Sequence, residues 1–261
     1  MGLAALMFFC NPVFAQGTAP TAGCEKEFNE GMRYTQLNQP DKARTEFEKC
    51  LTLLSSSDSH LPLVYFNIGQ TYFVNKSFNK AIENFKKAIA LDPSPWYFYM
   101  HLGKAYSLNN EPLPAVSSFL QSLKLKPMNL TVHYELYKLY DTLAKQSGYF
   151  KELVFRELYH LGKVNELEPG YFDKNLQFII PNLEHLISMA ERMTGSVPHA
   201  EQLIVVDSLE SANKLLLQKA QGEPLLTLPP DGISQEEKNR YFQKAKEYVS
   251  KNKSANFPTQ Q

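Results

Sequence analysis

The sequence repeats itself with a period of 34 residues. Two consecutive stretches align without a gap: YFNIGQTYFVNKSFNKAIENFKKAIALDP at 65–93 and YMHLGKAYSLNNEPLPAVSSFLQSLKLKP at 99–127. Six aligned positions keep their chemical character, with Tyr65, Gly69, Tyr72, Ala81, Phe85 and Pro93 opposite Tyr99, Gly103, Tyr106, Ala115, Phe119 and Pro127. A repeat of this length predicts an array of similar supersecondary units.

Each unit has the pattern of two helices joined by a turn. Apolar or small residues recur at spacings of three and four over 65–74 and again over 81–89, which marks one face of each helix. Pro93 ends the second helix, because proline removes a donor and disfavours helix in the residue before it. Gly69 and Ala81 are small, as two closely packed helices require.

The spacing resembles the tetratricopeptide repeat, whose signature is aromatic-x2-Leu-Gly-x2-Tyr, then Ala-x3-Phe, then Pro. The resemblance extends over units at 24–57, 62–95, 96–129 and 130–171, with Glu27 in place of the first aromatic and Tyr137 in place of the fourth glycine. It implies an all-α fold, a right-handed superhelical stack of helix-turn-helix repeats. The fourth unit is expected to have a longer second helix, over about 150–167.

The repeat register fades after residue 171. We expect a degenerate helical hairpin over 172–222, with helices at 176–193 and 200–220, and a linker rich in proline and glycine over 223–233. The last segment, 234–261, is expected to hold a capping helix, because Ser234 and Glu237 form a capping box. Such terminal helices cover the apolar end of a repeat stack.

The first fifteen residues, MGLAALMFFCNPVFA, carry no charge and read as a signal peptide cleaved after Ala15. No Lys or Arg precedes the apolar stretch, and a buried N-terminal helix is the alternative. Cleavage would imply export to the periplasm or cell envelope, or secretion if the host is not Gram-negative. No later segment is long and apolar enough to predict a transmembrane helix.

Cys24 and Cys50 would remain in the exported chain. A pair of cysteines in an oxidising compartment predicts a disulfide. A second hypothesis concerns Cys24 alone, because the letters TAGC at 21–24 resemble the lipidation box of bacterial lipoproteins. In that case Cys24 would carry a lipid anchor.

Charge and motifs exclude several classes of function. Lys+Arg and Asp+Glu both number 27, so the chain lacks the basic surplus of a nucleic-acid-binding protein. The six histidines have no metal-ligand spacing, and there is no glycine-rich phosphate loop or Gly-x-Ser-x-Gly elbow. We therefore expect no catalytic residue, no metal and no cofactor.

The first helix of each unit has more apolar residues than its repeat signature requires. Tetratricopeptide arrays bind a peptide or helix in a groove lined by these helices, so the resemblance implies a protein partner. The predicted groove residues are Phe28, Met32, Leu63, Phe66, Gln70, Phe73, Tyr97, Met100, His101, Lys104, Tyr134 and Lys138. Their apolar members are expected to form an exposed patch. Of the positions that grip C-terminal carboxylates in some family members, only Asn67 fits, so binding of chaperone tails is not expected.

These observations predict a non-enzymatic adaptor of the bacterial periplasm or cell envelope that binds a partner protein. The alternative is an enzyme or glycan-binding protein whose site lies in residues 172–261.

Overall fold

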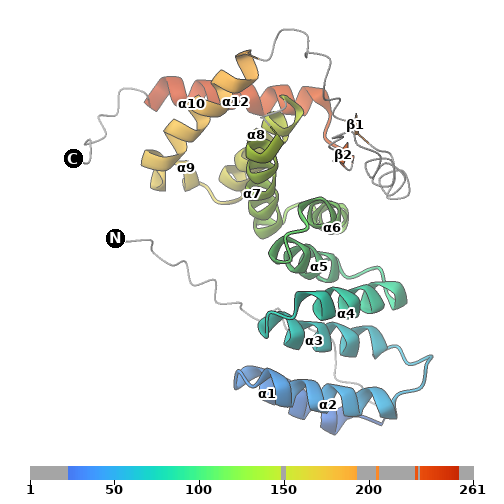
Figure 1. Ribbon diagram of the computed structural model, residues 1–261. Helices are drawn as coiled ribbons and strands as arrows, with labels where there is room; N and C mark the ends of the chain where they lie inside the picture. The colour runs from blue at the N-terminus through green and yellow to red at the C-terminus, as the bar shows by residue number, and fades with distance from the viewer. Residues whose placement is uncertain (1–22, 148–150, 193–203, 206–226, 229, 253–261) are drawn as a thin grey trace. The chain divides into compact units, whose positions relative to one another are not determined.

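The computed structural model (Figure 1) describes residues 23–147, 151–192, 204–205, 227–228 and 230–252. The chain divides into two compact units, Met1–Ala105 and Tyr106–Gln261. The predicted signal peptide and its cleavage site lie outside the described residues.

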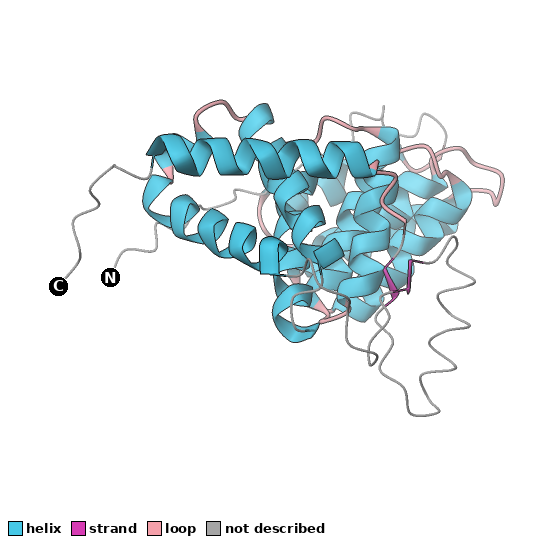
Figure 2. Ribbon diagram, turned by 90° about the horizontal axis from the view of Figure 1, so that it is seen from above, coloured by secondary structure: helices cyan, strands magenta, loops and turns pink. Residues whose placement is uncertain are grey.

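Helices make up most of the described chain (Figure 2). The first unit contains α1 (Glu25–Gln36), α2 (Pro40–Leu53), α3 (Leu61–Val74), α4 (Phe78–Leu91) and α5 (Trp96–Leu108) as far as Ala105. The second contains α6 (Pro112–Leu125), α7 (Leu130–Ser147), α8 (Lys151–Leu167), α9 (Tyr171–Lys174), α10 (Leu176–Arg192) and α12 (Gln235–Asn252). No helix in these ranges is long and apolar enough to cross a membrane.

Successive helices pack as hairpins, and the predicted all-α repeat fold is confirmed. In the first unit α1 packs on α2 and α3 on α4, with α2 also against α3. In the second unit α7 packs on α8 and α6 on α7. Local contacts between neighbouring hairpins stabilise arrays of this kind.

The turns inside the hairpins share one backbone feature. Asn38, Lys76 and Asn110 have positive φ angles of 53°, 57° and 60°. Each follows the first helix of its hairpin, where a left-handed residue commonly ends a helix. The second helices α2 and α6 then begin with proline in their first turn, a position that needs no donor.

Glycine allows the two helices of a hairpin to approach. A Cβ atom on Gly69 would lie 2.6 Å from the Phe85 ring, and one on Gly31 would lie 2.6 Å from Phe47. The aromatic ring of the second helix therefore occupies the space that a side chain on the first helix would fill.

The same contact recurs between α8 and α12, far apart in the sequence. A Cβ on Gly162 would collide with the ring of Tyr241. On α8, Leu158-x2-Leu161-Gly162 repeats the spacing of Tyr65-x2-Ile68-Gly69. Helix α12 thus packs on α8 through the same glycine–ring contact that joins the two helices of a repeat, and α9 and α10 lie between α8 and α12 in the sequence. We call α8 and α12 a split hairpin.

The region after residue 192 differs from the prediction. Residues 204–205 form a short strand, β1 (Ile204–Val205), paired in parallel with β2 (Thr227–Leu228). The predicted helix over 200–220 is wrong at these two residues, and the rest of it lies outside the described residues. The backbone N–H of Glu237 donates to Ser234 Oγ at 3.1 Å, as the capping box requires, and α12 follows.

A disulfide joins Cys24 to Cys50, whose Cα atoms lie 4.9 Å apart. It connects the start of α1 to the end of α2, and both residues are buried. Because the bridged residues are 26 positions apart, the bond restricts the unfolded chain. Reduction should lower the free energy of unfolding of the first unit by about 3 kcal/mol. Urea unfolding with and without dithiothreitol measures this change, and coincident curves would contradict it.

Candidate functional site

Two rows of residues, one on α3 and one on the first part of α5, lie next to each other. One row is Phe66, Gln70 and Phe73 on α3, and the other is Tyr97, His101 and Lys104 on α5. Spacings of four and three place each row on one side of its helix. Side-chain contacts link the rows at two levels, described below, and we call this surface the α3–α5 face.

Aromatic rings make the first level. The Phe66 ring centroid lies 5.2 Å from that of Tyr97 and 4.8 Å from that of Phe98, and it also contacts Phe85. Phe66 is only 1% exposed, whereas Tyr97 is half-buried. Burial raises the pKa of the Tyr97 hydroxyl, so this ring stays neutral. Phe66 therefore belongs to the packed interior, and Tyr97 forms the edge of the surface.

A polar pair makes the second level. Gln70 Nε2 lies 3.0 Å from His101 Nδ1, and the amide donates to that nitrogen. Burial lowers the pKa of His101 to about 3, with a smaller contribution from Lys104, so the imidazole is neutral at physiological pH. The pair fixes the orientation of Gln70, which is half-exposed.

Phe73 and Lys104, the third residues of the two rows, are both half-exposed. Helix α3 contains no charged residue, and Lys104 is the only Lys, Arg, Asp or Glu in α5. Within the described part of the chain Lys104 has no ion-pair partner. The α3–α5 face thus presents two rings, an amide and one free cation.

The expected exposure of the groove residues is wrong for part of the set. The buried members are Phe28, Leu63, Phe66, Met100 and His101. Phe28 packs against Phe47, and Phe66 packs as described above. Rings of α5 cover Phe66 and the Phe47 ring of α2 contacts Phe28, so these two rings are core residues and do not face solvent.

The remaining predicted residues are accessible to different degrees. Met32 on α1 is half-buried, as are Gln70, Phe73, Tyr97 and Lys104. In the second unit Tyr134 is half-buried near Tyr137 and Tyr171. Lys138 is exposed, pairs with Glu135 at 2.8 Å and lies over the Tyr134 ring. In the first unit, four accessible predicted residues therefore gather on the α3–α5 face.

Sequence reasoning missed a buried carboxyl group in the second unit. Glu157 lies twelve residues before Pro169, where Ala81 and Ala115 stand before Pro93 and Pro127. It is fully buried, and neither of its oxygens has a hydrogen-bond partner among the described residues. Burial, and then Asp141, raise the pKa of Glu157 to about 9, partly opposed by Lys145. A carboxyl group occupies a position that the repeat fills with a methyl group.

The raised pKa predicts a pH-dependent stability. The folded state holds the Glu157 proton more tightly than the unfolded chain does. The contribution of this proton to the free energy of unfolding is therefore complete below about pH 4.5 and is lost as the pH rises toward 9. Glu157→Gln should therefore stabilise the protein at pH 8 by roughly 2 kcal/mol and have little effect at pH 5. Urea unfolding of the variant and the parent protein at pH 5 and pH 8 tests this prediction. Other groups titrate in both proteins, so their effects cancel when the two free energies of unfolding are subtracted. Glu247→Gln on the exposed side of α12 is the control, and an equal shift at both pH values would contradict the prediction.

A pair of histidines is also buried between α7 and α8. His133 Nδ1 lies 2.8 Å from His160 Nδ1, and His133 Nε2 lies 3.0 Å from the carbonyl oxygen of Pro127. That carbonyl can only accept, so Nε2 of His133 carries the proton and His160 donates through Nδ1. Burial lowers the pKa of both rings, that of His133 to about 4. The pair is a neutral element of the core, and no group of three His, Cys, Asp or Glu in the described ranges could hold a metal ion.

Comparison with protein families agrees with the helix pairs. Residues 62–95 and 28–53 each match a family model described as tetratricopeptide repeat. The matched segments correspond to α3–α4 and to most of α1–α2. The fold and these matches define a helical-repeat protein. It contains tetratricopeptide repeats in these two segments.

Solved structures with this fold are similar over different parts of the chain. The first tetratricopeptide repeat domain of Spaghetti (RPAP3), solved with an HSP90 peptide, is 25% identical, with 45% of this chain and 90% of that chain covered and a TM-score of 0.42. MamA is 18% identical over 90% of this chain and 96% of its own, with a TM-score of 0.48. YrrB is 17% identical over 64% and 84%, with a TM-score of 0.48. A search of the curated proteins gave no match.

Proposed function

We propose that this protein is a non-enzymatic adaptor that binds a segment of a partner protein on the α3–α5 face. The observation that carries the proposal is the surface formed by Gln70, Phe73, Tyr97 and Lys104 on the first helices of two adjacent tetratricopeptide repeats. Rigid helices hold these side chains, and the buried residues Phe66 and His101 support them from below. Aromatic residues presented on such a support are typical anchors of protein interfaces.

The electrostatics of the face suit an uncharged or weakly acidic segment. Lys104 is its single charge, and the whole chain has no net charge. Long-range steering would be weak, so the affinity should change little with salt concentration.

We also propose that the protein is exported to the bacterial periplasm or cell envelope. The uncharged apolar residues 1–15 support export, and the Cys24–Cys50 disulfide is of a kind that persists in oxidising compartments. Intact-mass analysis of protein from its native host tests this directly. A chain that begins at Gln16 is expected, a retained leader would contradict cleavage, and an acylated Cys24 would support the lipoprotein hypothesis instead.

The alternative, an enzymatic or glycan-binding site in 172–261, has weaker support. The cavity formed in part by these residues is lined by Glu166, which hydrogen-bonds to Tyr241, Lys244 and Lys163. Burial opposes ionisation, but these hydrogen bonds together lower the pKa of Glu166 to about 2. A carboxylate with this pKa has no proton to donate at neutral pH.

Binding experiments can separate the proposed face from the rest of the repeat. Cross-linking in the native host with mass spectrometry would identify a partner, whose affinity is then measured by calorimetry. The variant Phe73→Ala/Lys104→Ala should weaken binding at least tenfold with little loss of stability, since both side chains are half-exposed. The matched control is Leu91→Ala/Lys87→Ala on the exposed side of α4. Equal affinities for the variant, the control and the parent would exclude the α3–α5 face.

A further inference from the structure

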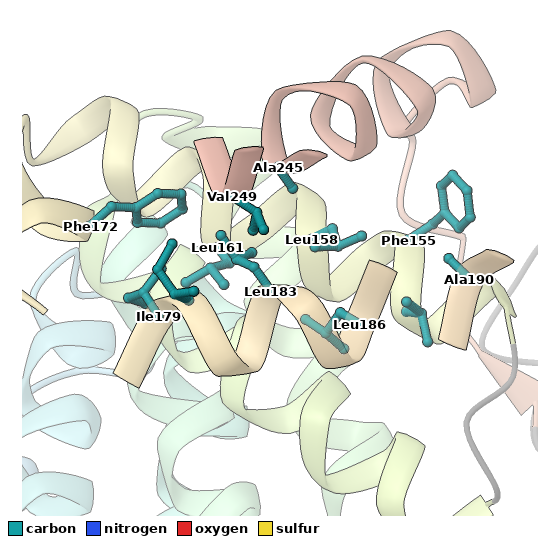
Figure 3. Packing of buried hydrophobic residues seen from close by; sticks show 12 residues of the cluster. Phe155, Leu158, Leu161, Phe172, Ile179, Leu183, Leu186, Ala190, Ala245 and Val249 are labelled. Atoms are coloured by element: carbon teal, nitrogen blue, oxygen red, sulfur yellow. The ribbon is translucent and has the colours of Figure 1, made fainter. Parts of the chain in front are cut away.

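A cavity of about 200 Å³ lies in the second unit, between α8, α9, α10 and α12. Apolar side chains form much of its lining: Leu158, Phe172, Leu183 and Ala245. All four belong to the hydrophobic cluster of this unit, in which Phe172 and Leu183 converge beside α8 and α12 (Figure 3). The cavity is thus a hollow in a well-formed core that has an opening to solvent.

Small residues on the paired helices leave this space. Gly162 allows the Tyr241 ring to lie against the α8 backbone, and Ala245, one turn after Tyr241, adds only a methyl group. Larger residues at these positions would fill the space between α8 and α12.

Aromatic rings form the walls. Tyr241, Tyr248 and Phe172 all line the cavity, and the Phe172 and Tyr248 rings meet in a T-shaped contact with centroids 5.0 Å apart. The Tyr248 hydroxyl donates to Asp173, and the Tyr241 hydroxyl donates to Glu166, both at 2.6 Å. These hydrogen bonds hold the rings in place.

The polar groups of the lining can recognise a carbonyl group. Asn165 uses its side-chain oxygen to accept the backbone N–H of Phe172, and its NH₂ group makes no other hydrogen bond within the described ranges. The charged residues of the lining are Glu166 and Lys244, which form an ion pair at 2.6 Å. An amide donor is therefore available, while the local charges are balanced.

We propose that this cavity binds the aromatic side chain of a phenylalanine or tyrosine in a peptide, with a backbone carbonyl of that peptide accepting from Asn165. An apolar cavity of about 150 Å³ accommodates one benzene ring, so the volume here suffices for one aromatic side chain. Three aromatic walls favour an aromatic occupant over an aliphatic one, because rings gain from edge-to-face contacts. The balanced charges favour a neutral side chain. The site shares no residue with the α3–α5 face, so either proposal can fail without the other.

Methyl NMR of the full chain tests this site, with N-acetyl-phenylalanine amide as the probe. Saturable shifts are expected for the methyl groups of Leu158, Leu183 and Ala245, and none for Val64 or Ala81 in the first unit. N-acetyl-leucine amide should bind at least threefold more weakly, and N-acetyl-glycine amide should cause no shift. Equal affinities of the phenylalanine and leucine probes would overturn the aromatic assignment, and the absence of saturable shifts would overturn the site.

Two buried alanines of the same cluster provide a matched pair of variants. Ala245 lines the cavity, whereas Ala190 lies away from Phe172, near Phe155 (Figure 3). Ala245→Leu should fill the cavity and weaken the probe at least tenfold, and Ala190→Leu should leave its affinity unchanged. Equal weakening by both would overturn the proposal. If either variant does not fold, the titrations of the parent protein with the three probes decide the question.

Discussion

Replacement of Phe66 by alanine should lower the free energy of unfolding by about 3–5 kcal/mol, the usual cost of removing a buried aromatic ring. Phe66 is 1% exposed and contacts rings from α4 and α5, including Phe85 and Phe98. Its removal would leave a cavity where two repeats meet. Chemical unfolding measures the loss, and disulfide-intact protein must be used throughout.

Phe73→Ala is the matched control, because Phe73 lies seven residues later on the same side of α3 but is half-exposed. It contacts the Phe78 ring, so a smaller loss of about 1 kcal/mol is expected. If Phe66→Ala and Phe73→Ala lower the free energy of unfolding by the same small amount, Phe66 is not a core residue. The expectation that its ring is exposed would then hold after all.

Replacement of Arg156 by methionine should cost about 3–5 kcal/mol, because it leaves the buried carboxylate of Asp231 and the partly buried one of Glu152 with a single shared counter-ion, Lys238. Arg156 is 1% exposed, with Nε 2.7 Å from Glu152 and 2.9 Å from Asp231. Asp231 Oδ2 forms an ion pair with Arg156, but the geometry of this contact is not that of a hydrogen bond. Lys238 of α12 contacts the same two carboxylates, at 2.6 Å and 3.3 Å. The four groups alternate in charge and fasten α12 to α8.

A compensating variant makes this prediction specific to charge. Arg156→Met/Asp231→Asn should recover part of the stability, since one of the two carboxylates that share Lys238 is neutralised when Arg156 is removed. Arg240→Met on α12 is the surface control, because the exposed Arg240–Glu237 pair should contribute less than about 1 kcal/mol. A loss for Arg156→Met as small as that of the control would show that the network does not fasten α12.

The sequence was sufficient to predict the hairpins, because their signature residues act locally. Gly69 and Phe85 meet within one unit, and the 34-residue period locates them. The burial of Phe66 could not be read from one helix, because the rings that cover it come from the next repeat. Amphipathic periodicity counts apolar residues on a helix, but it does not say how much of a helix the neighbouring repeat covers.

The partners of Arg156 and Gly162 were unpredictable for a related reason. Asp231 and Tyr241 follow them only after two helices and a long stretch of chain, and nothing local links the pairs. One signal was present, since Leu158-x2-Leu161-Gly162 repeats the spacing that begins a unit. In the first two hairpins the glycine at that spacing, Gly31 or Gly69, contacts a phenylalanine ring, and Gly162 contacts the Tyr241 ring in the same way.

The split hairpin of α8 and α12 has a consequence for how the chain assembles during synthesis. The first repeats can fold as soon as they leave the ribosome, because each pairs with its immediate neighbour. Tyr241 reaches Glu166 across 75 positions, so α8 remains without this partner until that further stretch of chain has been synthesised. Until then the apolar side of α8 is open to other chains or to chaperones. The packing of α8 therefore waits for α12, whereas that of the first repeats does not.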